Sequence, residues 1–126
     1  MPETNQLEIP VDLVVNEQQD CAGTATVSFP VDNLDAGNVK DFRAAIERAA
    51  ATHDALLLDM SRLTFVDSSG LGALLSCLRT MKGKKGQLLL FGMTKPVRAL
   101  FELVRMHRIF SIYNSQEEAL AELAAA

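Results

Sequence analysis

The sequence predicts a single α/β domain with a mostly parallel sheet of four to five strands and about four helices. Its 126 residues, 48% hydrophobic and 22% charged, suit one globular domain with its own core. Short apolar runs alternate with longer amphipathic segments, which is the pattern of parallel strands joined by helices. No linker, repeat or low-complexity tract divides the chain. Residues 1–126 are therefore expected to form one domain, with its core from about 11 to 120.

Two strands are expected near the amino terminus. Residues 11–15 are apolar with one polar interruption, and residues 24–31 alternate apolar and polar side chains, as half-buried strands do. The polar segment from 17 to 23 ends in glycine and predicts a loop. The two strands are therefore expected to form an N-terminal β-hairpin, followed by a turn over residues 32–37.

Helical and strand-like segments then alternate. Residues 39–49 repeat apolar side chains at helical spacing and predict an amphipathic helix. Residues 55–60, "ALLLDM", are almost continuously apolar, which favours a strand covered on both faces. A second amphipathic helix is predicted over 71–81, and a second buried strand over 88–91.

The C-terminal part continues the alternation. Pro96 occupies a favourable first helical position, and residues 97–104 continue that helix. A last short strand is predicted over 109–113. Ser115 and Glu118 have the spacing of a capping box, in which each end of the motif satisfies a free backbone N–H group. A final helix should therefore follow Ser115 and end near residue 124.

This order predicts where a functional site would form. Loops that leave the carboxyl ends of parallel strands gather at one edge of the sheet, and sites in open α/β sheets form at that edge. Three loops should meet there, over residues 32–37, 64–69 and 92–95.

The stretch "FVDSSGLG", residues 65–72, lies in the second of these loops. Asp67 or Ser68 is a natural N-cap for the following helix, because a side-chain oxygen there accepts from an unpaired backbone N–H. A serine hydrolase elbow needs Gly-x-Ser-x-Gly, and Val66 and Asp67 stand where that pattern requires other residues. A phosphate-binding Gly-Lys-Ser/Thr loop is also absent. No catalytic residue is predicted, and the stretch offers an exposed serine hydroxyl at a helix start.

Composition excludes several function classes. The net charge is −4, and no basic run interleaves with aromatic residues, so direct nucleic-acid binding is not expected. The basic cluster Lys82, Lys84 and Lys85 is expected to be a solvated loop. Cys21 and Cys77 have no partner at a metal-binding spacing, so neither metal nor cofactor is expected, and Cys77 should be buried. No signal peptide or spanning apolar run is evident, so a cytoplasmic location without membrane insertion is expected.

Taken as a whole, the central segment of the chain has a pattern that resembles the signature of one protein family. Residues 56–75, "LLLDMSRLTFVDSSGLGALL", resemble the signature of the STAS-domain anti-sigma-factor antagonists. Residues 32–35 stand where that family has a Gly-Glu-Leu-Asp turn, and residues 94–120 resemble its C-terminal part. The resemblance is collinear from about residue 11 to 120. Asp32 replaces the family's turn glycine, and residues 104–107 replace its common Thr-Gly-Leu-Asp.

The resemblance implies a binding protein without enzymatic activity. Unphosphorylated members of the family bind an anti-sigma factor that is also a serine kinase, and so release the sigma factor. The kinase phosphorylates the first serine of the motif, which corresponds to Ser68 here, and the complex dissociates; a serine phosphatase reverses this. The alternative is a STAS subunit of a lipid-transport or other signalling complex that acts as a constitutive protein-interaction domain.

The resemblance also suggests the partner-binding residues. Asp35 matches the family's turn aspartate, although it would equally serve as a cap for a helix beginning near Ala36. The candidates share a place in the three loops or in the helical turns that follow them: Asp35, Asn38, Asp67, Ser68, Ser69, Gly70, Leu71 and Thr94.

Overall fold

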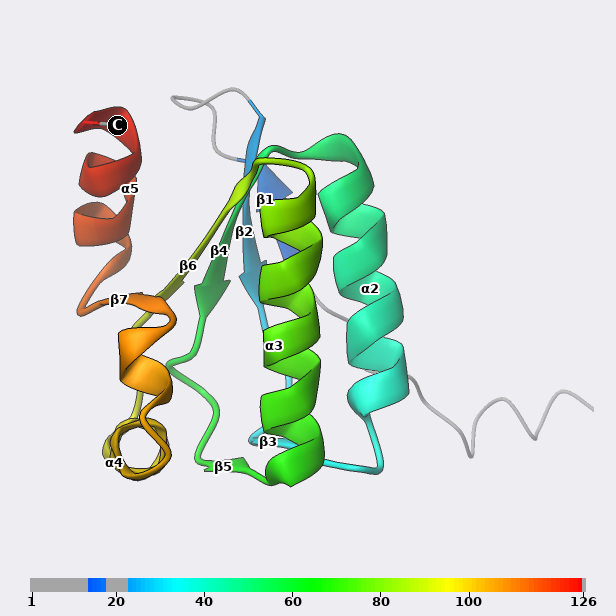
Figure 1. Ribbon diagram of the computed structural model, residues 1–126, viewed down its shortest axis with the longest axis vertical. Helices are drawn as coiled ribbons and strands as arrows, with labels where there is room; N and C mark the ends of the chain where they lie inside the picture. Colours follow the sequence, from blue (N-terminus) through cyan, green and yellow to red (C-terminus); the bar gives the residue numbers. More distant parts are fainter. Residues whose placement is uncertain (1–13, 18–22, 126) are drawn as a thin grey trace, which may run out of the picture.

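The computed structural model describes residues 14–17 and 23–125 and shows a twisted sheet between layers of helices (Figure 1). In chain order the elements are β1 (Val14–Glu17), β2 (Thr24–Ser28), β3 (Asn33–Leu34), α2 (Val39–Thr52), β4 (Ala55–Asp59), β5 (Phe65–Val66), α3 (Ser68–Gly83), β6 (Gln87–Phe91), α4 (Lys95–Leu103), the 3₁₀ turn η1 (Met106–Arg108), β7 (Ser111–Tyr113) and α5 (Gln116–Ala125).

The main sheet has five strands in the order β1-β2-β4-β6-β7. β1 pairs antiparallel with β2, and the other neighbours pair in parallel. The predicted hairpin and the mostly parallel sheet are thus confirmed, and residues 23–125 contain four α-helices, as the prediction of about four expects. Because each parallel crossover carries a helix, the carboxyl ends of β2, β4 and β6 share one edge of the sheet.

Two short strands were not predicted. β3 lies inside the segment expected to be only a turn, and β5 lies inside the second predicted loop. They pair in parallel as a separate two-stranded sheet, with Asn33 opposite Phe65 and Leu34 opposite Val66. A strand of two residues is too short to show an alternating pattern, so periodicity does not reveal it.

Several predicted strand boundaries are corrected. The strand expected over 24–31 ends at Ser28, before Pro30, which has no N–H to donate to a ladder. Glu17 belongs to β1 rather than to the following loop, while residues 11–13 and 18–22 lie outside the described part of the chain. The last strand begins at Ser111, because the two preceding N–H groups donate to the Met106 carbonyl.

The helix boundaries also differ in places. α3 begins at Ser68, directly after its predicted cap Asp67 and three residues before the periodic apolar positions 71–81. Pro96 is the second residue of α4, and Val104 is its C-cap rather than part of the helix. The capping box before α5 is confirmed in part: the Glu118 N–H donates to Ser115 Oγ at 3.2 Å, but the Glu118 carboxylate accepts from Asn114 N–H at 2.9 Å.

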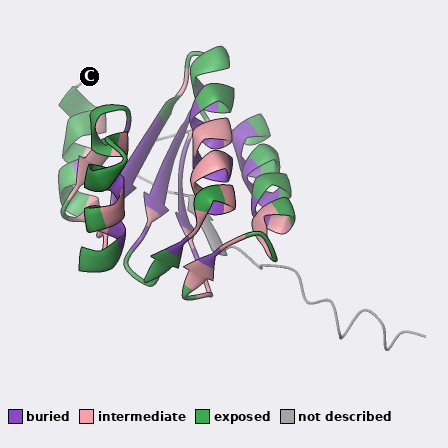
Figure 2. Ribbon diagram, turned by 60° about the horizontal axis from the view of Figure 1, so that its bottom comes forward, coloured by how far each residue is buried: buried purple, intermediate pink, exposed green. Residues whose placement is uncertain are grey.

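Alternate residues of the central strands face opposite layers. In β4, Leu56 and Leu58 join a large hydrophobic cluster, whereas Leu57 joins a smaller one. The large cluster lies under α2 and α3, and the small one lies under α5 (Figures 1 and 2). This confirms a strand covered on both faces, although it ends at Asp59 and Met60 lies outside it.

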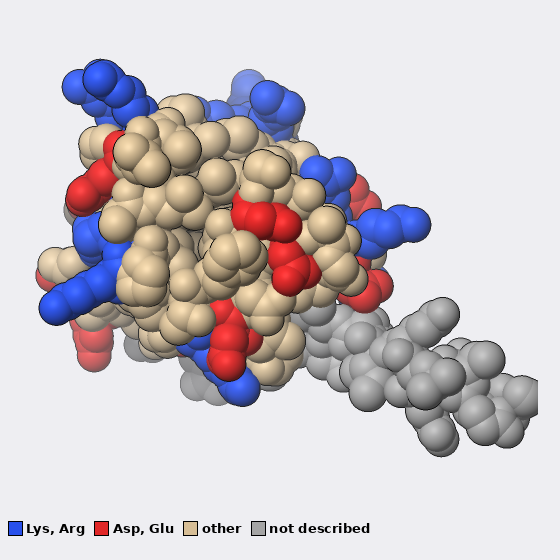
Figure 3. Space-filling model, turned by 90° about the horizontal axis from the view of Figure 1, so that it is seen from below, with Lys and Arg blue, Asp and Glu red and all other residues tan. Residues whose placement is uncertain are grey.

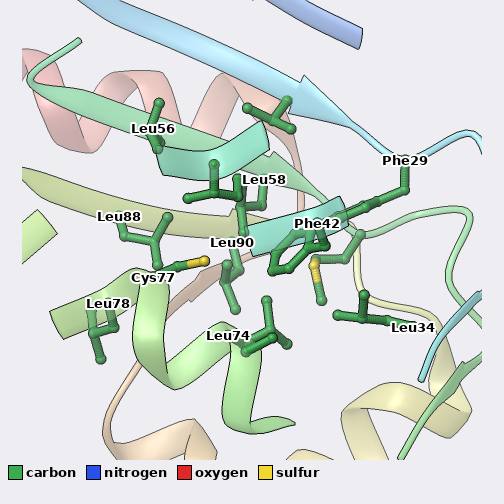
Figure 4. Close-up of a cluster of buried hydrophobic side chains, with 14 of the residues drawn as sticks. Phe29, Leu34, Phe42, Leu56, Leu58, Leu74, Cys77, Leu78, Leu88 and Leu90 are labelled. Atoms are coloured by element: carbon green, nitrogen blue, oxygen red, sulfur yellow. The ribbon is translucent and has the colours of Figure 1, made fainter. Parts of the chain in front are cut away.

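The larger core joins the sheet to the site edge. Phe42 of α2 and Leu74 of α3 are fully buried against the sheet, and Leu34 of β3 closes the cluster toward the loops (Figure 4). The rings of Phe29 and Phe42 are 5.4 Å apart, within the range of favourable aromatic contacts. The loops of the site therefore rest directly on packed side chains.

Lys84 is not part of a freely solvated loop. Its Nζ donates to the His53 carbonyl at 2.9 Å and to the Ala50 carbonyl. These are unpaired carbonyls at the end of α2, where a cation is favourable. Lys84 thus fixes the end of α2 that lies away from the serine loop.

Cys77 is buried at 3% exposure, as predicted. Burial raises the pKa of the Cys77 thiol from 9.0 to about 12, and the nearby Arg43 lowers it only in part. Since the folded pKa is the higher one, the neutral thiol stabilises the fold below about pH 9, and this contribution is lost as the pH rises toward 12.

In a Cys21→Ser background, we expect native Cys77 to react with a disulfide reagent at pH 8 far more slowly than the denatured chain does. Equal labelling rates would contradict its burial.

Candidate functional site

The three predicted loops do meet at one edge of the sheet. Backbone bonds join the first two, since Thr64 N–H donates to the Asp32 carbonyl at 2.7 Å and Asp67 N–H donates to the Leu34 carbonyl at 3.2 Å. The third loop is attached through Thr94, whose Oγ1 donates to the Leu63 carbonyl at 2.6 Å. The candidate site is therefore one connected surface rather than three independent loops.

Ser68 is the first residue of α3, and its side chain is exposed. The cap of this helix is Asp67, whose Oδ1 accepts from the Gly70 N–H at 2.9 Å. Of the two capping residues that the sequence allows, the structure uses Asp67. The hydroxyl of Ser68 is consequently not needed for capping and remains on the surface.

The second oxygen of Asp67 links the serine loop to the loop before α2. Asp67 Oδ2 accepts from the Ala36 N–H at 3.2 Å. One carboxylate thus holds the first turn of α3 and a backbone group 31 residues earlier in the chain. A substitution at Asp67 would loosen both segments together.

Gly70 sets how closely these two segments approach. A Cβ on Gly70 would lie 2.5 Å from the Leu34 carbonyl oxygen and 2.8 Å from Val66 Cγ1. Gly70 is buried, so it shapes the site from beneath and does not itself lie on the exposed surface. Leu71 is partly buried and packs against the core.

The loop before α2 is held by its own polar side chains. Asp35 Oδ1 accepts from the Gly37 N–H at 2.9 Å, and Asn38 Oδ1 accepts from the Asp35 N–H at 2.9 Å. Asn38 Nδ2 also donates to the Asn33 carbonyl at 2.9 Å. The expectation that Asp35 caps a helix beginning near Ala36 is wrong. α2 begins at Val39 with Asn38 as its N-cap residue, and Asp35 closes the turn before it.

Carboxylates concentrate around the exposed serine. Asp35 and Asp67 are half-buried in the two joined loops, and Asp32 is exposed beside them. Arg62 Nε pairs with Asp32 at 3.1 Å, but both side chains are well exposed, so this pair is weak. Figure 3 views the molecule from this end and shows acidic side chains on it. The surface therefore already carries negative charge before any modification of Ser68.

The structure separates the candidate residues by role. Ser68 is exposed and Ser69 is half-buried, so the hydroxyl of Ser68 is the more accessible. The other polar candidates use their side chains in hydrogen bonds to the backbone of the loops: Asp35, Asn38, Asp67 and Thr94. The three loops thus supply both the exposed surface around Ser68 and the hydrogen bonds that hold this surface in place.

Sequence reasoning missed Phe65 as a site residue. Its side chain is 55% exposed, although it belongs to β5 and stands three residues before Ser68. Its neighbour Val66 is buried, as alternation in a strand requires. No sequence pattern marks this exposure, because β5 has only two residues and is too short to show alternation.

Two further features concern membranes and metals. Over residues 14–17 and 23–125, no helix is long and apolar enough to cross a bilayer. In the same ranges, no group of three His, Cys, Asp or Glu side chains lies close enough to hold a metal ion. The carboxylate of Asp59 instead accepts two hydrogen bonds from Ser61, one from its N–H at 3.0 Å and one from its Oγ at 2.6 Å.

Comparison with known proteins places the chain in a family. An anti-sigma F factor antagonist of Paenibacillus polymyxa is 33% identical over 79 residues, which cover 63% of this chain and 66% of that protein. An anti-sigma-B factor antagonist of Listeria monocytogenes is 25% identical over 91 residues, covering 71% of this chain and 80% of that protein.

Solved structures show the same fold at lower identity. The anti-sigma factor antagonist SpoIIAA in its unphosphorylated form aligns with a TM-score of 0.73 at 22% identity, covering 91% of this chain and 98% of that one. The murine anion transporter Slc26a9 aligns with a TM-score of 0.75 at 21% identity, covering 98% of this chain but 24% of the transporter. The sequence pattern of the STAS domain matches residues 13–119. Since this match spans most of the 126 residues, the chain belongs to the STAS domain family.

Proposed function

We propose that this protein is a phosphorylation-controlled binding protein and not an enzyme. Its unphosphorylated form binds an anti-sigma factor with serine kinase activity and so releases a sigma factor. The kinase phosphorylates Ser68, binding is lost, and a serine phosphatase restores the first state. The observation that carries this proposal is the exposed Ser68 hydroxyl at the start of α3, left free because Asp67 performs the capping. The names of the Paenibacillus and Listeria relatives support the class of partner.

The physical effect of the modification is local. A phosphate adds a charge of about −1.5 to −2 near neutral pH. At a helix N-terminus this charge meets free N–H groups and the positive end of the helix dipole, so the fold need not open. On a surface that already carries Asp35 and Asp67, it adds bulk and negative charge where a partner had fitted. Phosphorylation therefore excludes the partner and leaves the domain folded.

The test uses two variants as baits in lysate from the native cells. Ser68→Ala should retain a kinase-type protein, and Ser68→Asp should lose it while keeping the same circular dichroism and a similar Tm. Thr80→Asp is the matched control, because it adds the same charge to an exposed position of α3, about 18 Å along the helix. It should retain the partner.

The alternative function predicts a different result from the same baits. A constitutive STAS subunit of a lipid-transport or other signalling complex would hold the same proteins with either residue at position 68. The fold itself is compatible with this, since it also occurs within the Slc26a9 transporter chain. Transporter subunits on both baits would favour the alternative and contradict the switch.

A further inference from the structure

An arginine of α2 reaches the first turns of α3. The two helices lie side by side on the same face of the sheet (Figure 1). A Cβ built on Gly72 would have Arg43 Nη2 as its nearest neighbour, at 4.0 Å. The guanidinium group of Arg43 therefore lies over the part of α3 where Gly72 leaves space.

Gly72 shares a helix face with both serines of the motif. It follows Ser68 by four residues and Ser69 by three, and side chains at these spacings stand next to each other, about 5–6 Å apart. Side chains of a helix also lean toward its N-terminus. Gly72, beside which the guanidinium lies, is thus about one helical turn from Ser68, a gap that a phosphate on Ser68 and an extended arginine together can close.

Arg43 has no competing partner among residues 14–17 and 23–125. In that part of the chain its guanidinium makes no hydrogen bond or ion pair, although it also lies near Cys77, and Glu47 stands one turn further along α2. By contrast, Arg62 on the site surface is already paired with Asp32. Arg43 is therefore a cation that lies one helical turn from the serine and is available to a phosphate there.

We propose that Arg43 is the internal counterion for phosphorylated Ser68. This rests on the phosphorylation of Ser68 proposed above. The planar guanidinium donates two N–H groups to two phosphate oxygens, a geometry that arginine favours and lysine cannot match. The phosphate is then held against the groove between α2 and α3.

The pairing sets the charge state of the phosphate. Asp67 precedes Ser68 in the chain, Asp35 lies in the neighbouring loop that Asp67 holds, and Glu47 follows Arg43 on α2. These carboxylates oppose the second ionisation of the phosphate, whereas Arg43 favours it. Arg43 is thus a positioning residue that keeps the phosphate dianionic at neutral pH.

The experiment incorporates phosphoserine at position 68 during synthesis and follows its ³¹P NMR signal against pH. Arg43→Gln should raise the second pKa of the phosphate by about 0.5 or more, and Arg43→Lys should restore only part of the difference. Arg48→Gln is the matched control, because Arg48 is also exposed on α2 but points about 140° away. It should leave the titration unchanged.

An unchanged phosphate titration in Arg43→Gln, or equal shifts in Arg43→Gln and Arg48→Gln, would overturn this assignment. The measurement needs no partner protein, so it separates the role of Arg43 from the proposed function. If Arg43→Gln leaves the phosphate unaffected while Ser68→Asp still loses its partner, the switch stands without this counterion. If the titration shifts but both Ser68 baits hold the same proteins, Arg43 pairs with a phosphate that does not control binding.

Discussion

Gly70→Ala should destabilise the fold by about 1–3 kcal/mol, the usual cost of forcing extra volume into a packed region. The added Cβ would lie 2.5 Å from the Leu34 carbonyl oxygen, and a backbone atom cannot move aside as the end of a side chain can. Alanine favours a helix by up to about 1 kcal/mol over glycine, which offsets only part of this cost. Urea denaturation of the variant should therefore show a lower unfolding midpoint.

Gly83→Ala is the control for this experiment. Gly83 ends the same helix, and an added Cβ there would meet nothing within 4 Å. Its stability should stay the same or rise by up to about 1 kcal/mol through helix propensity. If Gly70→Ala were also neutral, the close approach of β3 to α3 would not constrain the site. The backbone amide signals of Leu34 and Ala36 should shift in Gly70→Ala and stay in place in Gly83→Ala.

Most of the fold could be predicted from the sequence because the central elements carry strong periodic patterns. The apolar run at 55–60 and the helical spacing at 39–49 each specify an element several residues long, and both are confirmed. The hairpin and the capping residue Ser115 also follow from local chemistry. These signals lie within single segments, where neighbouring residues decide the conformation.

The parts that could not be predicted depend on contacts between distant segments. β3 and β5 exist because they pair with each other across about thirty residues of chain. The role of Asp35 likewise depends on the packing of its loop, which places the start of α2 at Val39. No local pattern reveals such pairings, since their energy comes from partners far apart in the sequence.

The candidate site also depends partly on local sequence signals and partly on contacts between distant segments. That a residue of the Asp-Ser pair caps α3 could be predicted, but the choice of Asp67 follows from its second bond to the Ala36 N–H. Because Asp67 performs the capping, the hydroxyl of Ser68 is not needed for it, and Ser68 is exposed. The exposure of Ser68 is thus a result of tertiary structure, although the motif that contains it is local.

Phe65→Ala should weaken partner binding strongly while changing stability by less than about 1 kcal/mol. The side chain is 55% exposed and stands on β5, three residues before Ser68. Exposed aromatic residues at the centre of an interface often supply its largest contributions, at least about 2 kcal/mol on truncation. Such a loss corresponds to roughly 30-fold in Kd.

Leu103→Ala provides the comparison. Leu103 is 80% exposed at the end of α4, so it matches Phe65 as an exposed apolar side chain but stands outside the three loops. With the protein retained by Ser68→Ala as ligand, titration calorimetry should show the loss for Phe65→Ala and little change for Leu103→Ala. The reverse order of effects would move the interface away from the serine loop. A phosphate on Ser68 would then lie outside the interface, where water and salt screen its charge from the partner. It would not be expected to exclude the partner.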